Sequence, residues 1–187
     1  PDDVLTIIFT SGSTGDPKGV VLTEENVGSN VRAIDHMLHL SAADVALGVL
    51  PFFHSYGYTT TLWTPLVLDP AVVYHADPRD AQVVGRLARE YHATILMATP
   101  TFLRIYVRRT PAEDFSTLEA VFGAAEKLPR EVSDAFERKF GVRPNEAYGA
   151  TELAPLVAAN VPPSRHVPGR PIDTREGTVG QPIAGCR

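Results

Sequence analysis

The chain has 187 residues, of which 44% are hydrophobic and 21% charged, as expected of a globular domain long enough to bury a core. Its formal net charge of −5 excludes an overall basic field that would favour nucleic acid or an anionic membrane. The single cysteine, Cys186, excludes a disulfide within the chain, and no apolar stretch reaches the ~20 residues that cross a bilayer. We therefore expect a soluble, cytoplasmic segment with no nucleic-acid partner and no membrane insertion. A longer parent protein could still associate with a membrane through other parts.

The first part of the chain is predicted to form strands around one helix. Residues 4–9 and 19–22 are β-branched and apolar runs, which predict two strands joined as a hairpin by a polar tip. Thr23 can cap the helix that follows. The apolar residues of that helix recur at helical spacing, at Val27, Val31, Ile34 and Leu38. Two further buried strands are predicted at residues 46–50 and 71–74.

The second part alternates strands and amphipathic helices. Asp77 and Pro78 predict a helix start, as N-cap and first helical residue. One face of that helix would carry Val84, Leu87, Ala88 and Tyr91. Strands are predicted at residues 94–97, 119–122 and 142–148, and helices begin at Thr99-Pro100 and at Pro129, the latter ending at Gly141. Residues 161–175 are rich in proline and arginine and predict a surface loop.

This alternation of strands and helices is typical of βαβ units. It predicts an α/β fold, a three-layer αβα sandwich with a largely parallel sheet and helices on both faces. Ligands bind such sheets beyond the carboxyl ends of the strands. We therefore expect the functional loops to follow Phe9, Leu50, Phe122 and Tyr148. The chain begins at a proline and ends without a polar tail, which predicts a piece of a longer protein.

The segment Thr10-Ser-Gly-Ser-Thr-Gly-Asp-Pro-Lys-Gly19 has the components of a phosphate-binding loop. Its glycines let the backbone approach an anion, its hydroxyls and N–H groups can donate, and Lys18 supplies a cation. It is not a Walker A loop, because Pro17 precedes the lysine, Gly19 follows it, and a strand rather than a helix comes next. By composition alone, a flexible hairpin tip explains the segment equally well.

Three further stretches follow predicted strands and carry groups suited to a nucleotide site. Tyr148-Gly-Ala-Thr-Glu152 offers an aromatic face for a base, a hydroxyl for a phosphate and a hard carboxylate for Mg²⁺. Gly123-Ala-Ala-Glu-Lys-Leu-Pro129 offers small residues where main chain can approach a flat ring. Leu50-Pro-Phe-Phe-His-Ser-Tyr-Gly57 places His54 after a strand. In isolation, each of these also fits a structural role: a strand end with a helix cap, a plain turn, or a packing histidine.

Together these motifs resemble those of the adenylate-forming superfamily, which includes acyl-CoA synthetases, luciferases and peptide-synthetase adenylation domains. The resemblance covers the whole chain, residues 1–187, as an AMP-binding core segment of the large N-terminal domain. It implies ATP and Mg²⁺ as cofactors. The finer details look like acyl-acyl-carrier-protein synthetases, which form the synthetase part of bacterial 2-acylglycerophosphoethanolamine acyltransferases. These details are the segments Pro51-Phe-Phe-His-Ser-Tyr-Gly, Thr64-Pro-Leu, Gly123-Ala-Ala-Glu-Lys-Leu, Thr151-Glu-Leu-Ala-Pro-Leu-Val and Asn160-Val-Pro.

The resemblance implies a role for each matching residue. Tyr148 and Gly149 would contact adenine, Thr151 the α-phosphate, and Glu152 would hold Mg²⁺. His54 would lie near the acid carboxylate and the α-phosphate. The adenine and ribose pocket would be lined by Gly123, Ala124 and Ala125. The phosphate loop would bind through Thr10, Ser11, Gly12, Ser13, Thr14, Gly15 and Lys18.

The implied reaction is attack of a carboxylate, which we expect to be that of a fatty acid, on the α-phosphorus of ATP, giving acyl-AMP and pyrophosphate. Acyl transfer to the thiol of an acyl carrier protein would follow, with an acyl-CoA or aryl-CoA synthetase as the alternative enzyme. A non-catalytic nucleotide-binding module is the alternative from another class. The ribose-binding aspartate and the lysine-bearing C-terminal domain of the family have no counterpart in these 187 residues. We therefore expect the segment alone to be nearly inactive.

Overall fold

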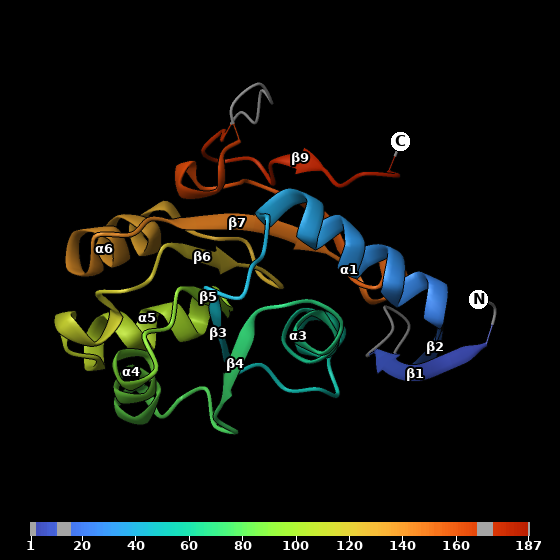
Figure 1. The fold of residues 1–187 in the computed structure, drawn as a ribbon, viewed down its shortest axis with the longest axis horizontal. Coiled ribbons are helices and arrows are strands. Elements are labelled where there is room, and N and C mark those ends of the chain that lie inside the picture. The colour runs from blue at the N-terminus through green and yellow to red at the C-terminus, as the bar shows by residue number, and fades with distance from the viewer. Residues whose placement is uncertain (1–2, 11–15, 168–173, 187) are drawn as a thin grey trace.

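The computed structural model describes residues 3–10, 16–167 and 174–186, and these are organised around a seven-stranded sheet (Figure 1). The strand order is β4-β3-β5-β6-β7-β8-β9. The first five strands in this order run parallel, whereas β8 and β9 are antiparallel additions at one edge. The strands are β3 (Val45–Gly48), β4 (Ala71–Tyr74), β5 (Ile95–Ala98), β6 (Ala120–Gly123), β7 (Pro144–Gly149), β8 (Leu156–Ala159) and β9 (Gln181–Pro182).

Helices cover both faces of this sheet, which confirms the predicted three-layer α/β fold. One face carries α4 (Ala81–Glu90), α5 (Pro100–Arg109) and α6 (Arg130–Phe140), and the other carries α1 (Glu24–Leu38). Successive strand residues point to opposite faces. Leu96 packs with the first group of helices, whereas Ile95 and Met97 pack on the α1 side.

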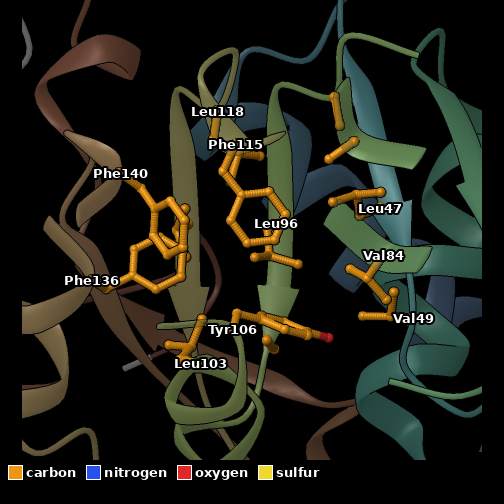
Figure 2. Packing of buried hydrophobic residues seen from close by; sticks show 14 of the residues in the cluster. Leu47, Val49, Val84, Leu96, Leu103, Tyr106, Phe115, Leu118, Phe136 and Phe140 are labelled. Atoms are coloured by element: carbon orange, nitrogen blue, oxygen red, sulfur yellow. The ribbon is translucent and has the colours of Figure 1, made fainter. Parts of the chain in front are cut away.

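The core beneath α4–α6 contains a group of packed aromatic rings among aliphatic side chains (Figure 2). Phe115, in the short helix η2 (Ala112–Phe115), has its ring centroid 4.9 Å from that of Phe140 and 5.7 Å from that of Tyr106. Phe136 stacks against Phe115 at 6.0 Å. Offset and edge-on ring pairs of this kind add to the stability gained from burial. This side of the sheet therefore forms a rigid platform for the loops at its edge.

The N-terminal strands β1 (Val4–Thr10) and β2 (Lys18–Thr23) form a separate antiparallel hairpin, as predicted. Helix α1 starts directly after β2 with a capping box between Thr23 and Asn26, each side chain accepting from the other residue's backbone N–H. Ile8 and Leu22 of the hairpin pack against Val27 of α1. The hairpin is therefore attached to the domain through α1.

Shorter helical segments complete the fold. Between β3 and β4 the chain forms α2 (Ser55–Gly57), the π-helical η1 (Tyr58–Trp63) and α3 (Thr64–Val67). Between β7 and β9 it forms the single turns η3 (Thr151–Leu153) and η4 (Pro163–Arg165). Across the described ranges, every helix is too short or too polar to cross a membrane.

The predicted start of α4 is wrong. Its N-cap is Asp80, whose side chain accepts from the backbone N–H of Val83 at 3.3 Å, and its first residue is Ala81. The carboxylate of Asp77 is instead occupied by Arg79, through the backbone and side-chain N–H groups. Tyr91, predicted on the buried face, lies beyond the last helical residue and is 49% exposed.

The predicted surface loop at residues 161–175 is also partly wrong. The side chain of Arg165 is 9% exposed and forms an ion pair with Asp44, whose side chain is 4% exposed. Val161 is buried as well. An arginine can be buried where a carboxylate neutralises it, and that carboxylate lies 121 positions earlier in the chain. Residues 168–173 of this segment lie outside the described residues.

Candidate functional site

A pocket of about 290 Å³ lies beyond the carboxyl ends of β3, β6 and β7. This is where a parallel sheet is expected to bind a ligand. The structure brings most of the sequence-predicted site residues to its wall, from four separate segments of the chain. These residues are Thr10, His54, Ala124, Ala125, Tyr148, Gly149, Thr151 and Glu152.

The remaining predicted residues are placed differently. Gly123 is buried at the end of β6 and is absent from the pocket wall; a Cβ there would lie 3.1 Å from Leu128 Cδ1. Lys18 is exposed at the start of β2, directly across the hairpin ladder from Thr10. Ser11, Gly12, Ser13, Thr14 and Gly15 lie outside the described residues.

His54 is held in a specific orientation at the N-terminus of α2. Its ring Nδ1 atom accepts a hydrogen bond from the backbone N–H of Tyr56 at 3.1 Å, and the backbone N–H of His54 donates to the Pro51 carbonyl at 3.2 Å. With Nδ1 as acceptor, the proton of the neutral imidazole sits on Nε2. Partial desolvation of the ring lowers the pKa of His54 below its ordinary value of 6.5. The side chain is therefore a neutral Nε2–H donor near pH 7.

The turn that carries His54 has no room for a larger residue at Gly57. A Cβ on Gly57 would lie 2.5 Å from the Pro51 carbonyl oxygen. The next residues form the π-helical η1, a rare conformation that is enriched at functional sites. Two of its hydroxyls bond back to the preceding turn: Thr60 Oγ1 donates to the Tyr56 carbonyl at 2.6 Å and Thr61 Oγ1 to the Gly57 carbonyl at 2.9 Å. Burial raises the pKa of Tyr56, whose hydroxyl donates to the Phe122 carbonyl at 3.4 Å.

The loop after β7 carries the other polar groups of the pocket. The backbone N–H of Ala150 donates to the Pro155 carbonyl at 2.9 Å, and a Cβ on Gly149 would lie 2.4 Å from that carbonyl oxygen. Glycine is therefore required where the two ends of the loop meet. The hydroxyl of Thr151 is 3.2 Å from that of buried Ser55, which links this loop to α2. Tyr148 leaves β7 with half of its surface exposed at the pocket.

Glu152 is suited to a divalent cation shared with a ligand. It is exposed at the pocket, and within residues 3–10, 16–167 and 174–186 its carboxylate has no hydrogen-bond or ion-pair partner. The same ranges contain no cluster of three or more His, Cys, Asp or Glu side chains that could hold a metal by themselves. Mg²⁺ is usually held by one or two carboxylates together with phosphate oxygens and water. The residues present therefore fit Mg²⁺ bound along with a phosphate ligand.

The turn after β6 presents small side chains and main chain to the pocket. Ala125 adopts the left-handed conformation with φ of 67°, which is uncommon for a residue other than glycine. The backbone around it is fixed, because Ala124 N–H donates to the Ala98 carbonyl at 3.2 Å and Leu128 N–H to Glu146 Oε1 at 3.3 Å. Such a wall lets a flat ring approach closely.

Sequence reasoning missed several residues of the pocket wall, which are Ser55, Tyr56, Thr60, Ala150, Pro155 and Leu156. Ser55 and Tyr56 lie inside the histidine motif, but their residue types alone show no ligand role. Tyr56 and Thr60 are four residues apart, the spacing that brings side chains to one face of a helix. That spacing was the available signal for Thr60.

A larger cavity of about 640 Å³ lies between the start of α6 and residues 174–177. It includes none of the sequence-predicted site residues. Two charged groups on its wall already pair with each other, since Arg143 lies 2.6 Å from Glu176, and Arg143 also pairs with Asp134 at 2.9 Å. The smaller pocket at the carboxyl edge of the sheet is therefore the stronger candidate site.

Comparison with known proteins shows which proteins this chain resembles. Residues 1–187 match the family model described as AMP-binding enzyme. The oxalate–CoA ligase of Arabidopsis thaliana is 32% identical over 187 residues, which cover 98% of this chain and 35% of the relative. The long-chain-fatty-acid–CoA ligase of Bacillus subtilis (strain 168) is 27% identical over 89% of this chain and 30% of the relative. The chain thus spans about a third of the length of these relatives.

Solved structures show the same fold. The anthranilate CoA ligase AuaEII in complex with anthranoyl-AMP superposes with a TM-score of 0.84 at 23% identity, over 98% of this chain and 34% of that one. The ATP-bound MatB of Rhodopseudomonas palustris gives a TM-score of 0.78 at 24% identity, over 97% of this chain and 34% of that one. At such identities the likeness concerns the fold alone.

Proposed function

Because this chain belongs to the AMP-binding enzyme family, we propose that it supplies the nucleotide-recognising part of an enzyme that activates a carboxylic acid with ATP. A carboxylate oxygen attacks the α-phosphorus, the bond to the bridging oxygen of pyrophosphate breaks, and acyl-AMP and pyrophosphate result. One observation carries the proposal. The pocket gathers an aromatic ring, a hydroxyl, an exposed carboxylate and a neutral imidazole donor, on Tyr148, Thr151, Glu152 and His54.

Each of these groups has a proposed task that suits its chemistry. Tyr148 stacks on adenine, against the small residues Ala124 and Ala125. The hydroxyl of Thr151 donates to an α-phosphate oxygen. His54 donates from Nε2 to the acid carboxylate or to the α-phosphate, and its neutral form keeps the nucleophile from forming an ion pair. Catalysis then consists mainly of positioning and charge neutralisation.

The phosphates of ATP are assigned to two sets of residues, the loop that starts at Thr10 and the turn that carries Glu152. The loop from Thr10 to Gly19, with Lys18, holds the β- and γ-phosphates and steers pyrophosphate away. Glu152 holds Mg²⁺, which when bound neutralises phosphate oxygens as charge shifts towards the leaving group. Thr10 is at the pocket wall and pairs with Lys18 across the hairpin, which supports this assignment.

The acid and the final acceptor are proposed from two different observations. The motifs that resemble acyl-acyl-carrier-protein synthetases favour a fatty acid and the thiol of an acyl carrier protein. The CoA ligases among the relatives favour CoA, and their acids range from oxalate to long-chain fatty acids. Pyrophosphate exchange with palmitate and with benzoate separates the acid classes, and acyl transfer to carrier protein or to CoA separates the acceptors.

We propose that residues 1–187 form a core segment and that the lysine-bearing C-terminal domain of the family belongs to a separate part of the full-length protein. The relatives are about three times as long as the chain, consistent with further domains in this family. The segment by itself should therefore be nearly inactive. A rate of acid adenylation by the 187-residue chain comparable to that of the full-length protein would contradict this.

The test is ligand-induced thermal stabilisation, in the full-length protein and in this chain, by Mg-ATP and by a non-hydrolysable acyl-adenylate analogue. Ligand at 100 times its Kd stabilises a protein by about 2.7 kcal/mol, which is easily seen as a shift in Tm. We expect the shift to be lost in Tyr148→Ala and reduced in Glu152→Ala. Tyr91→Ala removes another half-exposed tyrosine, remote from the pocket in the fold, and serves as the matched control.

The outcomes separate the candidate functions. A shift without pyrophosphate exchange for any acid would favour a non-catalytic nucleotide-binding module. The absence of a shift in the full-length protein would defeat the adenylation proposal.

A further inference from the structure

Asn30, in the middle of α1, makes three hydrogen bonds to the loop that follows β7. The residue is 4% exposed. Its Nδ2 donates to the Leu156 carbonyl at 2.9 Å and to the Leu153 carbonyl at 3.3 Å, and its Oδ1 accepts from the Leu156 N–H at 3.2 Å. The amide therefore uses both of its donors and its acceptor on main-chain atoms at the two sides of one short turn.

A second polar group holds the same turn between these points. The hydroxyl of Thr59, fully buried in η1, donates to the Ala154 carbonyl at 2.8 Å. Ala154 is 3% exposed and has a positive φ of 67°. A non-glycine residue keeps that conformation only where its surroundings determine it. The turn is thus shaped by α1 and η1, rather than by its own side chains.

These contacts bear on the site because the turn carries two of its proposed groups. Thr151 and Glu152 directly precede Leu153 and line the pocket, and Leu153 itself is half exposed. The Leu153 carbonyl therefore lies at the edge of the pocket and yet accepts from a buried helix residue, and this hydrogen bond restricts the position of the turn. The donors and the acceptor of this buried amide are all paired. Any other position of the turn would leave polar groups unsatisfied, so the amide favours one arrangement of the turn.

Helix α1 also connects this turn to the phosphate-loop hairpin. The helix begins directly after β2, whose first residue Lys18 is paired with Thr10. Leu22 of β2, Val27 and Val31 of α1, and Ala154 of the turn belong to one buried cluster. Asn30 lies on the same helix and adds the directional contacts. A single helix therefore fixes the position of the β1–β2 hairpin, proposed to bind the β- and γ-phosphates, relative to the turn after β7, proposed to bind the α-phosphate.

We propose that Asn30 is a positioning residue for Mg-ATP, an inference that rests on the adenylation function proposed above. By fixing the main chain at Leu153 and Leu156, it holds the Thr151 hydroxyl and the Glu152 carboxylate at the distance from the hairpin that a bound nucleotide requires. It touches neither the nucleotide nor the acid. Its loss should therefore weaken use of Mg-ATP and leave binding of the acid nearly unchanged.

The experiment measures pyrophosphate exchange by the full-length protein carrying Asn30→Ser or Asn30→Asp. Serine leaves room for water at the freed carbonyls, whereas aspartate keeps the size but removes both donors. Ser29→Ala, at the exposed neighbouring position of the same helix, is the matched control. Mg-ATP, free Mg²⁺ and acid are varied in turn, well below the Tm of each variant.

We expect kcat/KM for Mg-ATP to fall about 10- to 100-fold, as for other small displacements of catalytic groups. The Mg²⁺ concentration for half-maximal rate should rise, KM for the acid should stay within about twofold, and Ser29→Ala should match the wild type. A lower Tm with unchanged kinetics, or an equal loss for acid and for Mg-ATP, would show a structural role only and overturn the inference. If the wild-type protein shows no pyrophosphate exchange with any acid tested, the proposed function is overturned, and this inference with it.

Discussion

At the scale of single residues, the site depends on side chains whose hydrogen-bonding state is set by main chain beside them. His54 is the clearest case, because the backbone N–H of Tyr56 occupies its Nδ1 atom and leaves Nε2 to carry the proton. Thr151 is a second case, since its hydroxyl lies next to that of buried Ser55. Such local pairing orients a polar group before any ligand arrives, and so reduces the cost of organising the site on binding.

We predict that His54 titrates below 6.5, its ordinary value, with the neutral proton on Nε2. Partial desolvation disfavours the charged ring, and protonation also breaks the bond from Tyr56 N–H. The pKa is lower in the folded than in the unfolded state, so above about pH 6.5 this group contributes no pH dependence of stability. Below that pH the unfolded chain binds the proton more readily, and the free energy of unfolding falls as the pH drops.

The measurement is the ¹⁵N chemical shifts of the His54 ring across this pH range. His54→Gln, which removes the ring, confirms the assignment of the signals. A neutral ring protonated on Nδ1, or a pKa above the ordinary value, would contradict the prediction.

At the scale of secondary-structure elements, helix ends match their sequence signals where the side chain has no competing partner. Thr23 and Thr99 cap α1 and α5 as predicted, with hydrogen bonds to Asn26 N–H and Phe102 N–H. Asp77 does not cap α4, because Arg79 takes its carboxylate. Gly141 ends α6 in the left-handed conformation, with φ of 77°. Capping motifs thus locate an end correctly only when the capping group is available.

Two glycines should respond oppositely to alanine. Gly28→Ala, inside α1, should raise the free energy of unfolding by about 0.5–1 kcal/mol, because alanine favours helix and the added Cβ meets only the mobile tip of Arg32 at 3.4 Å. Gly141→Ala should lower it by about 1–2 kcal/mol, because the space around it is open and the conformation alone penalises a Cβ. Urea unfolding of both variants, each the control for the other, measures the difference. A rise in the free energy of unfolding for Gly141→Ala would refute the assignment of Gly141 to a left-handed cap.

At the scale of the whole molecule, one buried ion pair joins distant parts of the sheet. Arg165 Nη1 donates to Asp44 Oδ2 at 3.0 Å, and the same carboxylate accepts from Ser41 N–H at 2.9 Å and from the Thr94 hydroxyl at 3.1 Å. Asp44 directly precedes β3, Thr94 precedes β5, and Arg165 follows β8. The pair therefore attaches the segment after β8 to the amino ends of the central strands, at the opposite edge from the pocket.

Removing one partner of this pair should be costly. Asp44→Asn leaves buried Arg165 with only the exposed carboxylate of Glu119, 3.4 Å from its Nη2, as a counter-charge. Because the buried partner is lost, we expect the free energy of unfolding to fall by about 3–5 kcal/mol. Glu25→Gln breaks the exposed Arg32–Glu25 pair and serves as the matched control, with an expected loss of about 0–1 kcal/mol. Urea unfolding at neutral pH measures both. Equal effects of the two substitutions would show that the Asp44 pair does not hold the segment.

The same pair should produce acid sensitivity. Burial by itself would raise the pKa of Asp44, but the hydrogen bonds and charge of Arg165, with Ser41 and Thr94, hold it below the ordinary value of 3.8. The stabilisation is therefore present above about pH 4 and is lost as the pH falls through the lowered pKa. We expect Asp44→Asn to flatten this part of the stability curve, measured by urea unfolding between about pH 2 and 6. An unchanged slope would assign the acid sensitivity to other carboxylates.

The fold class, the succession of strands and helices along the chain, and most residues of the pocket wall could be predicted from the sequence. These depend on short-range properties, namely alternation of apolar residues, capping types and compact motifs such as Tyr148–Glu152. The carboxyl-edge rule then placed separate motifs together, because parallel strands end on one side of a sheet.

Contacts between groups far apart in the chain could not be predicted in this way. Ser55 and Thr151 are separated by 96 positions, Asn30 and Leu156 by 126, and Asp44 and Arg165 by 121. No local pattern distinguishes a helix asparagine that faces water from one that clamps a loop, or an arginine in a polar segment from a buried one. Those partners depend on strand order and on how α1 crosses the sheet, which the packing of the whole chain determines.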